Sequence, residues 1–314
     1  MITITDKYSK DADAIIYNGS CYEFVKKIPS ESVKLVVTSP PYNIGKEYEK
    51  RTDLDQYYKD QEKIIDECVR ILSEDGSICW QVGNYVTNGE IVPLDVLLFP
   101  IFTKHNLKLR NRIVWHFGHG LHASKRFSGR YETILWFTKG DNYTFNLDAV
   151  RIPQKYPNKK YFKGNKRGEL SCNPLGKNPS DIWEIPNVKS NHVEKTIHPC
   201  QFPIELIERL VLSMTNENDY VFDPFLGVGS TTAAAVKNKR KGIGSEIMKE
   251  YWEIAVERTE AAYNGTLKTR PMHKPVYDPA DPKINLNYDK ELHSQTQQTL
   301  FEKKRKYEVI NENR

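Results

Sequence analysis

Long apolar runs, paired cysteines and an acidic excess are all missing from this chain of 314 residues. A membrane-spanning helix needs about 18 or more consecutive apolar residues, and no stretch approaches that length. Residues 1–17 show no apolar segment behind a basic start, so no secretory leader is predicted. We therefore expect a cytoplasmic protein with no membrane partner.

Cysteine and metal-ligand patterns are also poor. The five cysteines are odd in number and none form a CxxC pair, which argues against a disulfide framework and a structural zinc site. His116, His119 and His122 are spaced by three in a glycine-broken stretch, but no carboxylate lies among them. Polar loop side chains explain them better than a metal site, so we expect no metal.

Charge is mild overall but clustered. The net charge of +5 permits a nucleic-acid partner without requiring one, and apolar and charged contents of 39% and 28% are ordinary for a globular protein. Residues 139–195 are rich in Lys, Asn, Pro and Gly and lack periodicity. Within them, positions 151–167 hold basic residues and no acidic one: Arg151, Lys155, Lys159, Lys160, Lys163, Lys166 and Arg167. Interleaved aromatic residues favour a DNA-contacting insertion over its alternative, a solvated loop.

Hydrophobic periodicity predicts an α/β fold. Short apolar runs predict strands at 33–37, 77–82, 113–117, 133–137, 220–222 and 241–246, and helical spacing predicts helices at 54–72, 91–106, 203–214, 231–238 and 250–263. Strands that alternate with helices indicate a Rossmann-like, mostly parallel sheet covered on both faces. Beyond residue 264 the sequence is polar and aperiodic, so a partly disordered extension is expected.

A strand-to-helix turn near the C-terminus has the features of a nucleoside site. The run from Val221 to Phe225 is followed by Gly227 and Gly229, and glycine is needed where backbone passes close to a ligand. Glu246 ends the next predicted strand, where a carboxylate can accept both hydrogen bonds of a ribose diol. Position 232 is Thr rather than the third glycine of a pyrophosphate cradle. A cofactor without phosphates is therefore favoured.

A second motif, Ser39-Pro40-Pro41-Tyr42, follows the first predicted strand. The lone pair of an amino group on a base is delocalised into the ring, so the group is a poor nucleophile. Two acceptors aimed at its protons, the Ser39 hydroxyl and the Pro40 carbonyl, would favour a pyramidal nitrogen and free that pair. The prolines make the loop rigid, and Tyr42 offers a face for a base rotated out of the duplex. Placement and electrostatics would then supply the rate.

The order of these motifs resembles that of the β-class DNA amino-methyltransferases that use S-adenosylmethionine. The resemblance runs from about residue 17 to residue 263, and includes the segments 18–21, 130–135 and 196–203. It implies a circularly permuted motif order and duplex DNA as substrate. It also implies a first catalytic part at 1–138, a target-recognition insertion at 139–195, a second catalytic part at 196–264 and an extension at 265–314. A cognate restriction endonuclease and a homodimer are common in this setting.

The resemblance also assigns roles to individual residues. The catalytic loop would be Ser39, Pro40, Pro41 and Tyr42. The cofactor would be bound by Asp223, Phe225, Gly227, Gly229, Ser230, Thr231 and Glu246, with His198, Pro199 and Phe202 closing over it. The basic residues from Arg151 to Arg167 would contact DNA.

Several alternatives stay open at this point. In the family, Ser at position 39 is usually associated with N4 of cytosine, whereas the continuation from Tyr42 to Lys46 also resembles N6-adenine enzymes; cytosine ranks narrowly first. Cys200 stands in a Pro-Cys-Gln context that resembles the nucleophile of cytosine C5 methylation, but in an order opposite to that family. An RNA base methyltransferase and a non-catalytic DNA-binding protein remain as further alternatives.

Overall fold

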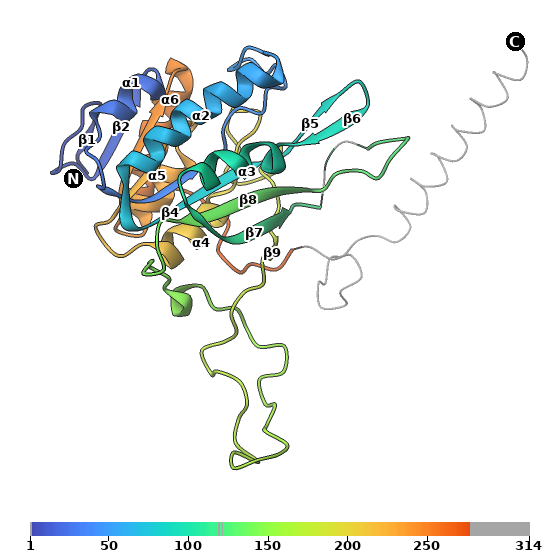
Figure 1. Ribbon diagram of the computed structural model, residues 1–314. Coiled ribbons are helices and arrows are strands. Elements are labelled where there is room, and N and C mark those ends of the chain that lie inside the picture. Colours follow the sequence, from blue (N-terminus) through green and yellow to red (C-terminus); the bar gives the residue numbers. More distant parts are fainter. Residues whose placement is uncertain (1, 119, 121, 277–314) are drawn as a thin grey trace, which may run out of the picture. The chain divides into compact units, whose positions relative to one another are not determined.

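A nine-stranded sheet forms the centre of the computed structural model, which describes residues 2–118, 120 and 122–276 (Figure 1). Its strands are β1 (Ile4–Thr5), β2 (Ala14–Asn18), β3 (Val33–Thr38), β4 (Leu72–Val82), β7 (Lys108–His116), β8 (Tyr131–Thr138), β9 (Ile182–Glu184), β10 (Tyr220–Asp223) and β11 (Lys241–Glu246). They are arranged in the order β1-β2-β11-β10-β3-β4-β8-β7-β9. Within this sheet β8 runs against both of its neighbours, and the other pairings are parallel.

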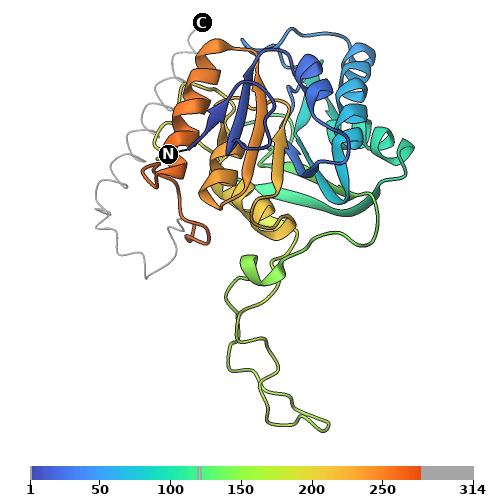
Figure 2. The same cartoon turned by 90° about the vertical axis from the view of Figure 1, so that its left-hand side faces the viewer.

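Helices cover both faces of the sheet. Figures 1 and 2 show α2 (Leu54–Ile71) and α3 (Leu94–Lys104) on one face, and α4 (Ile204–Met214), α5 (Ser230–Lys237) and α6 (Lys249–Tyr263) on the other. The short helix α1 (Cys21–Phe24) packs with α2, and two 3₁₀ turns lie at Val25–Lys27 and Leu147–Val150. The prediction of a mostly parallel sheet between helices is confirmed.

The central strands are buried on both sides, which explains their continuous apolar character. In β3, Val36 packs in the hydrophobic core under α2 and α3, while Leu35 and Val37 pack in the core under α4 and α5. Similarly, Trp80 of β4 faces the first core and Cys79 the second. Alternate side chains of one strand therefore fix both helical layers.

The turn between β10 and α5 depends on close packing. Gly229 has φ of 78°, and a Cβ there would lie 2.8 Å from the Cα of Ala255 in α6. This packing allows α5 to approach both α6 and the sheet closely. The turn that carries Gly227 and Gly229 is thus held at a fixed height above the carboxyl end of β10.

The predicted helix at 91–106 is wrong at its start. Residues Asn84–Thr87 (β5) and Glu90–Pro93 (β6) form a separate hairpin, and α3 begins only at Leu94. The reason lies in the turn, where Asn88 and Gly89 both adopt positive φ, as two-residue hairpins require. Strands β2 and β9 were not predicted from the sequence.

Residues 139–181 leave the sheet between β8 and β9 as a long excursion, which projects away from the strands in Figures 1 and 2. Isolated antiparallel bridges join Ile152 with Lys177 and Lys160 with Leu170, so its two arms run side by side. Contacts divide the chain into one unit at Met1–Lys274, which holds every element named above, and a second at Pro275–Arg314. Most of the extension at 265–314, which was expected to be partly disordered, lies outside the described residues, from position 277 onward.

Candidate active site

One hydrogen bond joins the two sequence motifs. β3 and β10 are adjacent and parallel, so Thr38 and Asp223 end their strands side by side. The Thr38 hydroxyl donates to Oδ1 of Asp223 over 2.5 Å, in a fully buried position. Loops that lie 185 positions apart in the chain therefore start from one point at the carboxyl edge of the sheet.

Asp223 uses both of its oxygens inside the protein. Oδ1 also accepts from the Phe225 backbone N–H at 3.0 Å, and Oδ2 accepts from the Thr231 hydroxyl at 2.6 Å. Burial raises the pKa of this carboxyl to about 6, and the three hydrogen bonds oppose that shift. Asp223, Gly229 and Thr231 lie behind the wall of the neighbouring cleft, where they shape the loops that line it.

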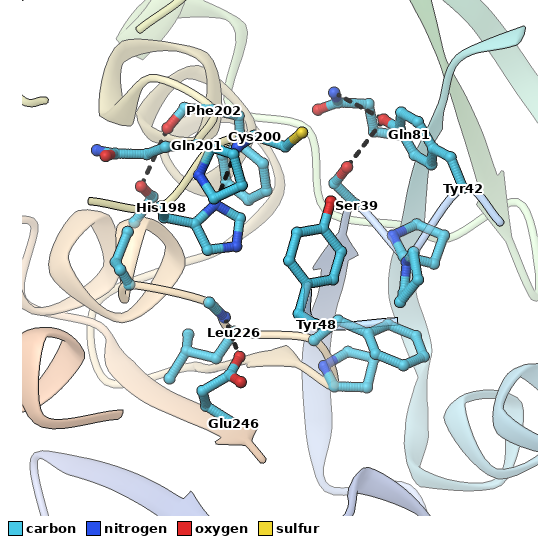
Figure 3. Close-up of a pocket in the computed structure, with 18 of the residues that line it drawn as sticks. Ser39, Tyr42, Tyr48, Gln81, His198, Cys200, Gln201, Phe202, Leu226 and Glu246 are labelled. Carbon is cyan, nitrogen blue, oxygen red and sulfur yellow. Dashed lines mark hydrogen bonds between the residues drawn. The ribbon is translucent and has the colours of Figure 1, made fainter. Parts of the chain in front are cut away.

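A cleft of about 450 Å³ opens above this point. The predicted site residues that line it are Ser39, Pro40, Pro41, Tyr42, His198, Pro199, Phe202, Phe225, Gly227, Ser230 and Glu246. Ser39 lies on one wall, and Glu246 and His198 lie on the opposite side (Figure 3). The geometry thus places the base motif and the cofactor motif in a single cavity.

A polar network lies behind Ser39. The Ser39 and Tyr42 hydroxyls are 2.9 Å apart, and the Tyr42 hydroxyl donates to Oε2 of Glu132 over 3.0 Å. Nε2 of Gln81 donates to the same Glu132 oxygen over 2.6 Å. Glu132 comes from β8 and Gln81 from the end of β4, so adjacent antiparallel strands supply the two groups.

This network sets the direction of the Ser39 hydroxyl. Because the Tyr42 hydroxyl donates its proton to Glu132, the Tyr42 oxygen is available to accept from Ser39. The Ser39 proton then points toward Tyr42, and its lone pairs are free to accept hydrogen bonds from the cleft. Burial raises the pKa of both Glu132 and Tyr42, and the bonds from Gln81 and Tyr42 oppose the shift at Glu132.

Glu246 is anchored by the main chain. Its Oε2 accepts from the Gly227 N–H at 2.8 Å and its Oε1 from the Met248 N–H at 2.8 Å. Burial raises the pKa of this carboxyl to about 7, against the effect of these bonds. Each oxygen keeps a second lone pair, so the carboxylate can receive two further donors, such as a vicinal diol.

An aromatic cluster covers the cofactor end. The His198 ring stacks on Tyr48, with centroids 5.2 Å apart, and meets Tyr251 edge-on at 4.7 Å. Burial lowers the pKa of His198 to about 4, so the imidazole is neutral at physiological pH. The Ser230 hydroxyl donates to the Phe202 carbonyl over 3.0 Å and ties this segment to α5. A neutral aromatic wall of this kind suits a heterocycle or a sulfonium group.

Sequence reasoning missed several parts of the cleft, among them Tyr48, Gln81, Glu132 and the segment from Asn187 to Lys189. Glu132 was noted only within the segment 130–135, without a role. A polar Gln at the end of the apolar run of β4 was the available signal for Gln81.

The basic residues predicted to bind DNA lie outside the cleft. Arg151 is tied to the carboxylate of Asp148 at 2.6 Å and to the carbonyl of Gly176 at 3.0 Å, so it holds the base of the excursion. The others are exposed on its surface.

In the part of the chain that the structure describes, no group of three His, Cys, Asp or Glu side chains has the geometry of a metal site; His119 lies outside that part. The described residues also contain no helix long and apolar enough to span a bilayer.

These features define a cofactor-dependent group-transfer enzyme with a base pocket, and similarity to known proteins gives the family. Residues 33–257 match the family model described as DNA methylase, which unites N6 and N4 methyltransferases, and the chain belongs to this family. The protein is therefore an S-adenosylmethionine-dependent DNA amino-methyltransferase, as the motifs predicted. The alternative of cytosine C5 methylation through Cys200 is wrong, as is that of a DNA-binding protein without catalysis.

Relatives support this assignment over most of the chain. The Type II methyltransferase M.BglII from Bacillus subtilis is 55% identical over 243 residues, which cover 77% of this chain and 68% of that protein. M.ScaI, a Type II methyltransferase from Streptomyces caespitosus, is 41% identical and covers 81% and 84%. The DNA adenine methyltransferase YhdJ from Escherichia coli (strain K12) is 33% identical and covers 82% and 85%.

Solved structures share the fold. The PvuII DNA methyltransferase (cytosine-N4-specific) superposes with a TM-score of 0.64 at 20% identity, covering 85% of this chain and 94% of that one. TTHA0409 from Thermus thermophilus, in complex with S-adenosyl-L-methionine, superposes with a TM-score of 0.57 at 25% identity, covering 83% and 99%.

Replacing Glu132→Gln should lower kcat on DNA by about tenfold or more, because an amide no longer fixes the Tyr42 proton and Ser39 loses its preferred orientation. The Kd for S-adenosylmethionine, measured by calorimetry, should stay within about twofold. Glu184→Gln, which changes an exposed carboxylate on β9 of the same sheet, serves as the matched control and should leave kcat unchanged. An unchanged kcat in Glu132→Gln would contradict the orienting role.

Cofactor affinity should weaken as pH falls from about 8 to about 6. The raised pKa of Glu246, about 7, means that the carboxyl gains its proton in this window and loses acceptor capacity. The Kd should rise by up to roughly tenfold per pH unit below that pKa. Calorimetric titrations of Glu246→Gln should show weaker binding without this pH dependence, and parallel profiles for both proteins would refute the assignment. Asp223 contributes only near pH 6, and His198 stays neutral throughout.

Proposed function

We propose that this protein methylates N4 of cytosine in duplex DNA, at a base rotated out of the helix into the cleft. The observation that supports this most directly is the position of the Ser39 hydroxyl, which lies 2.9 Å from the Tyr42 hydroxyl and lines the same cavity as Glu246. An acceptor in that position faces an amino group on one side and the methyl donor on the other.

The proposed reaction needs no covalent enzyme intermediate. Bound S-adenosylmethionine supplies an electrophilic methyl group. The Ser39 hydroxyl and the Pro40 carbonyl accept hydrogen bonds from the amino group of the base, so its lone pair is available to attack. A nitrogen–carbon bond forms as the sulfur–carbon bond breaks, the sulfonium becomes a neutral thioether, and the displaced proton passes to solvent. Tyr42 contributes its ring as a stacking surface.

The same proposal assigns a role to each of the residues that would bind the cofactor. Glu246 accepts the ribose hydroxyls, and Phe225 with Gly227 contacts the methionine part. His198, Pro199 and Phe202 cover the cofactor from the opposite side, supported by the bond between Ser230 and the Phe202 carbonyl.

The nearest alternative substrate is N6 of adenine. The name of YhdJ, a DNA adenine methyltransferase, shows that a 33% identical relative acts on that base. Cytosine is favoured because residue 39 is Ser, which leaves one hydroxyl rather than a carboxylate or amide as the side-chain acceptor.

Mass analysis of nucleosides from DNA exposed to the enzyme and S-adenosylmethionine tests the proposal. N4-methylcytosine is the expected product, and Ser39→Ala should reduce its formation by about 10²-fold with cofactor binding near normal. N6-methyladenine would overturn the choice of base alone. Unmodified DNA, or an unaffected Ser39→Ala variant, would overturn the assigned role of the loop.

We also propose that the excursion at 139–181, within the predicted recognition insertion at 139–195, contacts DNA. Lys155, Lys159, Lys160, Lys163, Lys166 and Arg167 are exposed along it, together with Tyr156 and Phe162. The triple variant Lys160→Gln, Lys163→Gln and Lys166→Gln removes three positive charges. In a filter-binding series, its DNA affinity should depend less steeply on salt, with the magnitude of the slope of log affinity against log salt reduced by about 3. Lys239→Gln, which changes an exposed lysine in the turn before β11 and outside the excursion, is the control; equal slopes would contradict the proposal.

The names of the relatives indicate the biological setting that we propose for this protein. M.BglII and M.ScaI are named Type II methyltransferases, which supports a restriction-modification role with a cognate endonuclease. Two exposed apolar pairs, Val86 with Ile91 in the hairpin and Val96 with Phe99 on α3, support a homodimer. Sedimentation equilibrium tests the dimer, and a search for restriction activity encoded beside this protein tests the setting.

A further inference from the structure

The loop between β7 and β8, residues 117–130, carries an unusual side chain. Phe127 is fully exposed, at 100% of its reference area. Lys125, Arg126 and Arg130 surround it in sequence, and no acidic residue occurs between positions 117 and 131. An exposed phenylalanine contributes no burial to folding, so a basic loop that presents one is suited to a partner that is both anionic and able to stack.

The loop rises from the rim of the cleft. β7 is parallel to the strands that carry the site and β8 is antiparallel, so β7 ends and β8 begins at the carboxyl edge of the sheet. The Phe117 N–H donates to the Arg130 carbonyl over 3.0 Å and extends the ladder by one step. Phe117 and Glu132, which flank the two roots of the loop, both line the cleft. Figure 1 shows the loop extending beyond both strands.

The described part of the loop is folded so that Phe127 lies near its end. The Ala123 N–H donates to the Ser128 hydroxyl over 3.1 Å, which closes a turn over residues 123–128. A nitrogen of Arg130 lies 3.4 Å from Nδ1 of His122, linking the two arms below that turn. Residues 119 and 121 lie outside the described residues.

We propose that Phe127 enters the base stack of the DNA at the position vacated when the target base rotates into the cleft. This rests on the proposed function. Extrusion loses the pairing and stacking energy of the target base, and an aromatic ring in the gap restores part of the stacking. Apolar side chains inserted between base steps are a general means of holding DNA in a distorted state. Lys125 and Arg126 bind phosphates beside the gap.

Phe127→Ala provides the test, with the recognition sequence read from the methylated positions left by the wild-type enzyme. On a fully paired duplex, kcat/KM should fall about tenfold or more. On the same duplex with the target base opposite an abasic position, where extrusion is already easy, the loss should be below about threefold. Fluorescence of 2-aminopurine at the target position should rise less on binding of the variant than on binding of the wild type.

Matched variants separate this role from others. Phe127→Trp should retain activity on both duplexes. Phe162→Ala, an exposed phenylalanine on the excursion (82% exposed), should affect the two duplexes equally. The melting temperature and cofactor affinity of Phe127→Ala should match the wild type, since the ring packs against nothing that folding buries.

If Phe127→Ala loses kcat/KM equally on both duplexes, or on neither, the proposed insertion of Phe127 into the base stack is wrong. A wild-type enzyme that produces no methylated amino group would overturn the proposed function instead, before the variants are compared.

Discussion

The hydrogen bond between Thr38 and Asp223 is the constraint on which the site depends. It lies at 0–1% exposure, where an unpaired carboxylate would be costly, and it fixes the starting points of two loops from distant parts of the chain. The same oxygen also accepts from the Phe225 N–H, and the other oxygen accepts from the Thr231 hydroxyl; these two bonds set the turn toward α5. One buried acid therefore joins the two loops from a position behind the wall of the cleft.

Much of this arrangement was predictable, because it depends on local signals. The Ser39–Tyr42 and Phe225–Gly229 turns follow apolar strands, and strand ends of a parallel sheet meet at one edge. The resemblance to amino-methyltransferases then supplied the permuted order and the cofactor, and the family match and the related structure in complex with S-adenosyl-L-methionine confirm the cofactor. The local sequence pattern alone could not predict that β3 and β10 are neighbours, because it does not pair segments so far apart in the chain.

The parts that escaped prediction depend on long-range pairing. Glu132 reaches Tyr42 only because β8 runs antiparallel beside β4, and a single sequence gives no register for such a pair. Residues 91–93 at the end of the hairpin were predicted as helix because Ile91 and Val92 fit a helical stripe as well as a strand. Its Asn88-Gly89 turn was the stronger signal. Because β8 is antiparallel, the loop at 117–130 also lies beside the cleft. The charge pattern of the sequence did not identify this loop as part of the site.

The anchoring of Glu246 has a consequence for ligand discrimination. Because the Gly227 and Met248 N–H groups already hold its two oxygens, the carboxylate presents a fixed pair of acceptors before anything binds. A vicinal diol satisfies both, whereas a 2′-deoxy sugar satisfies one and leaves the other acceptor unpaired. With Glu246 in its proposed role, this pair of acceptors favours the ribonucleoside of the cofactor over the deoxynucleotides of the polymeric substrate.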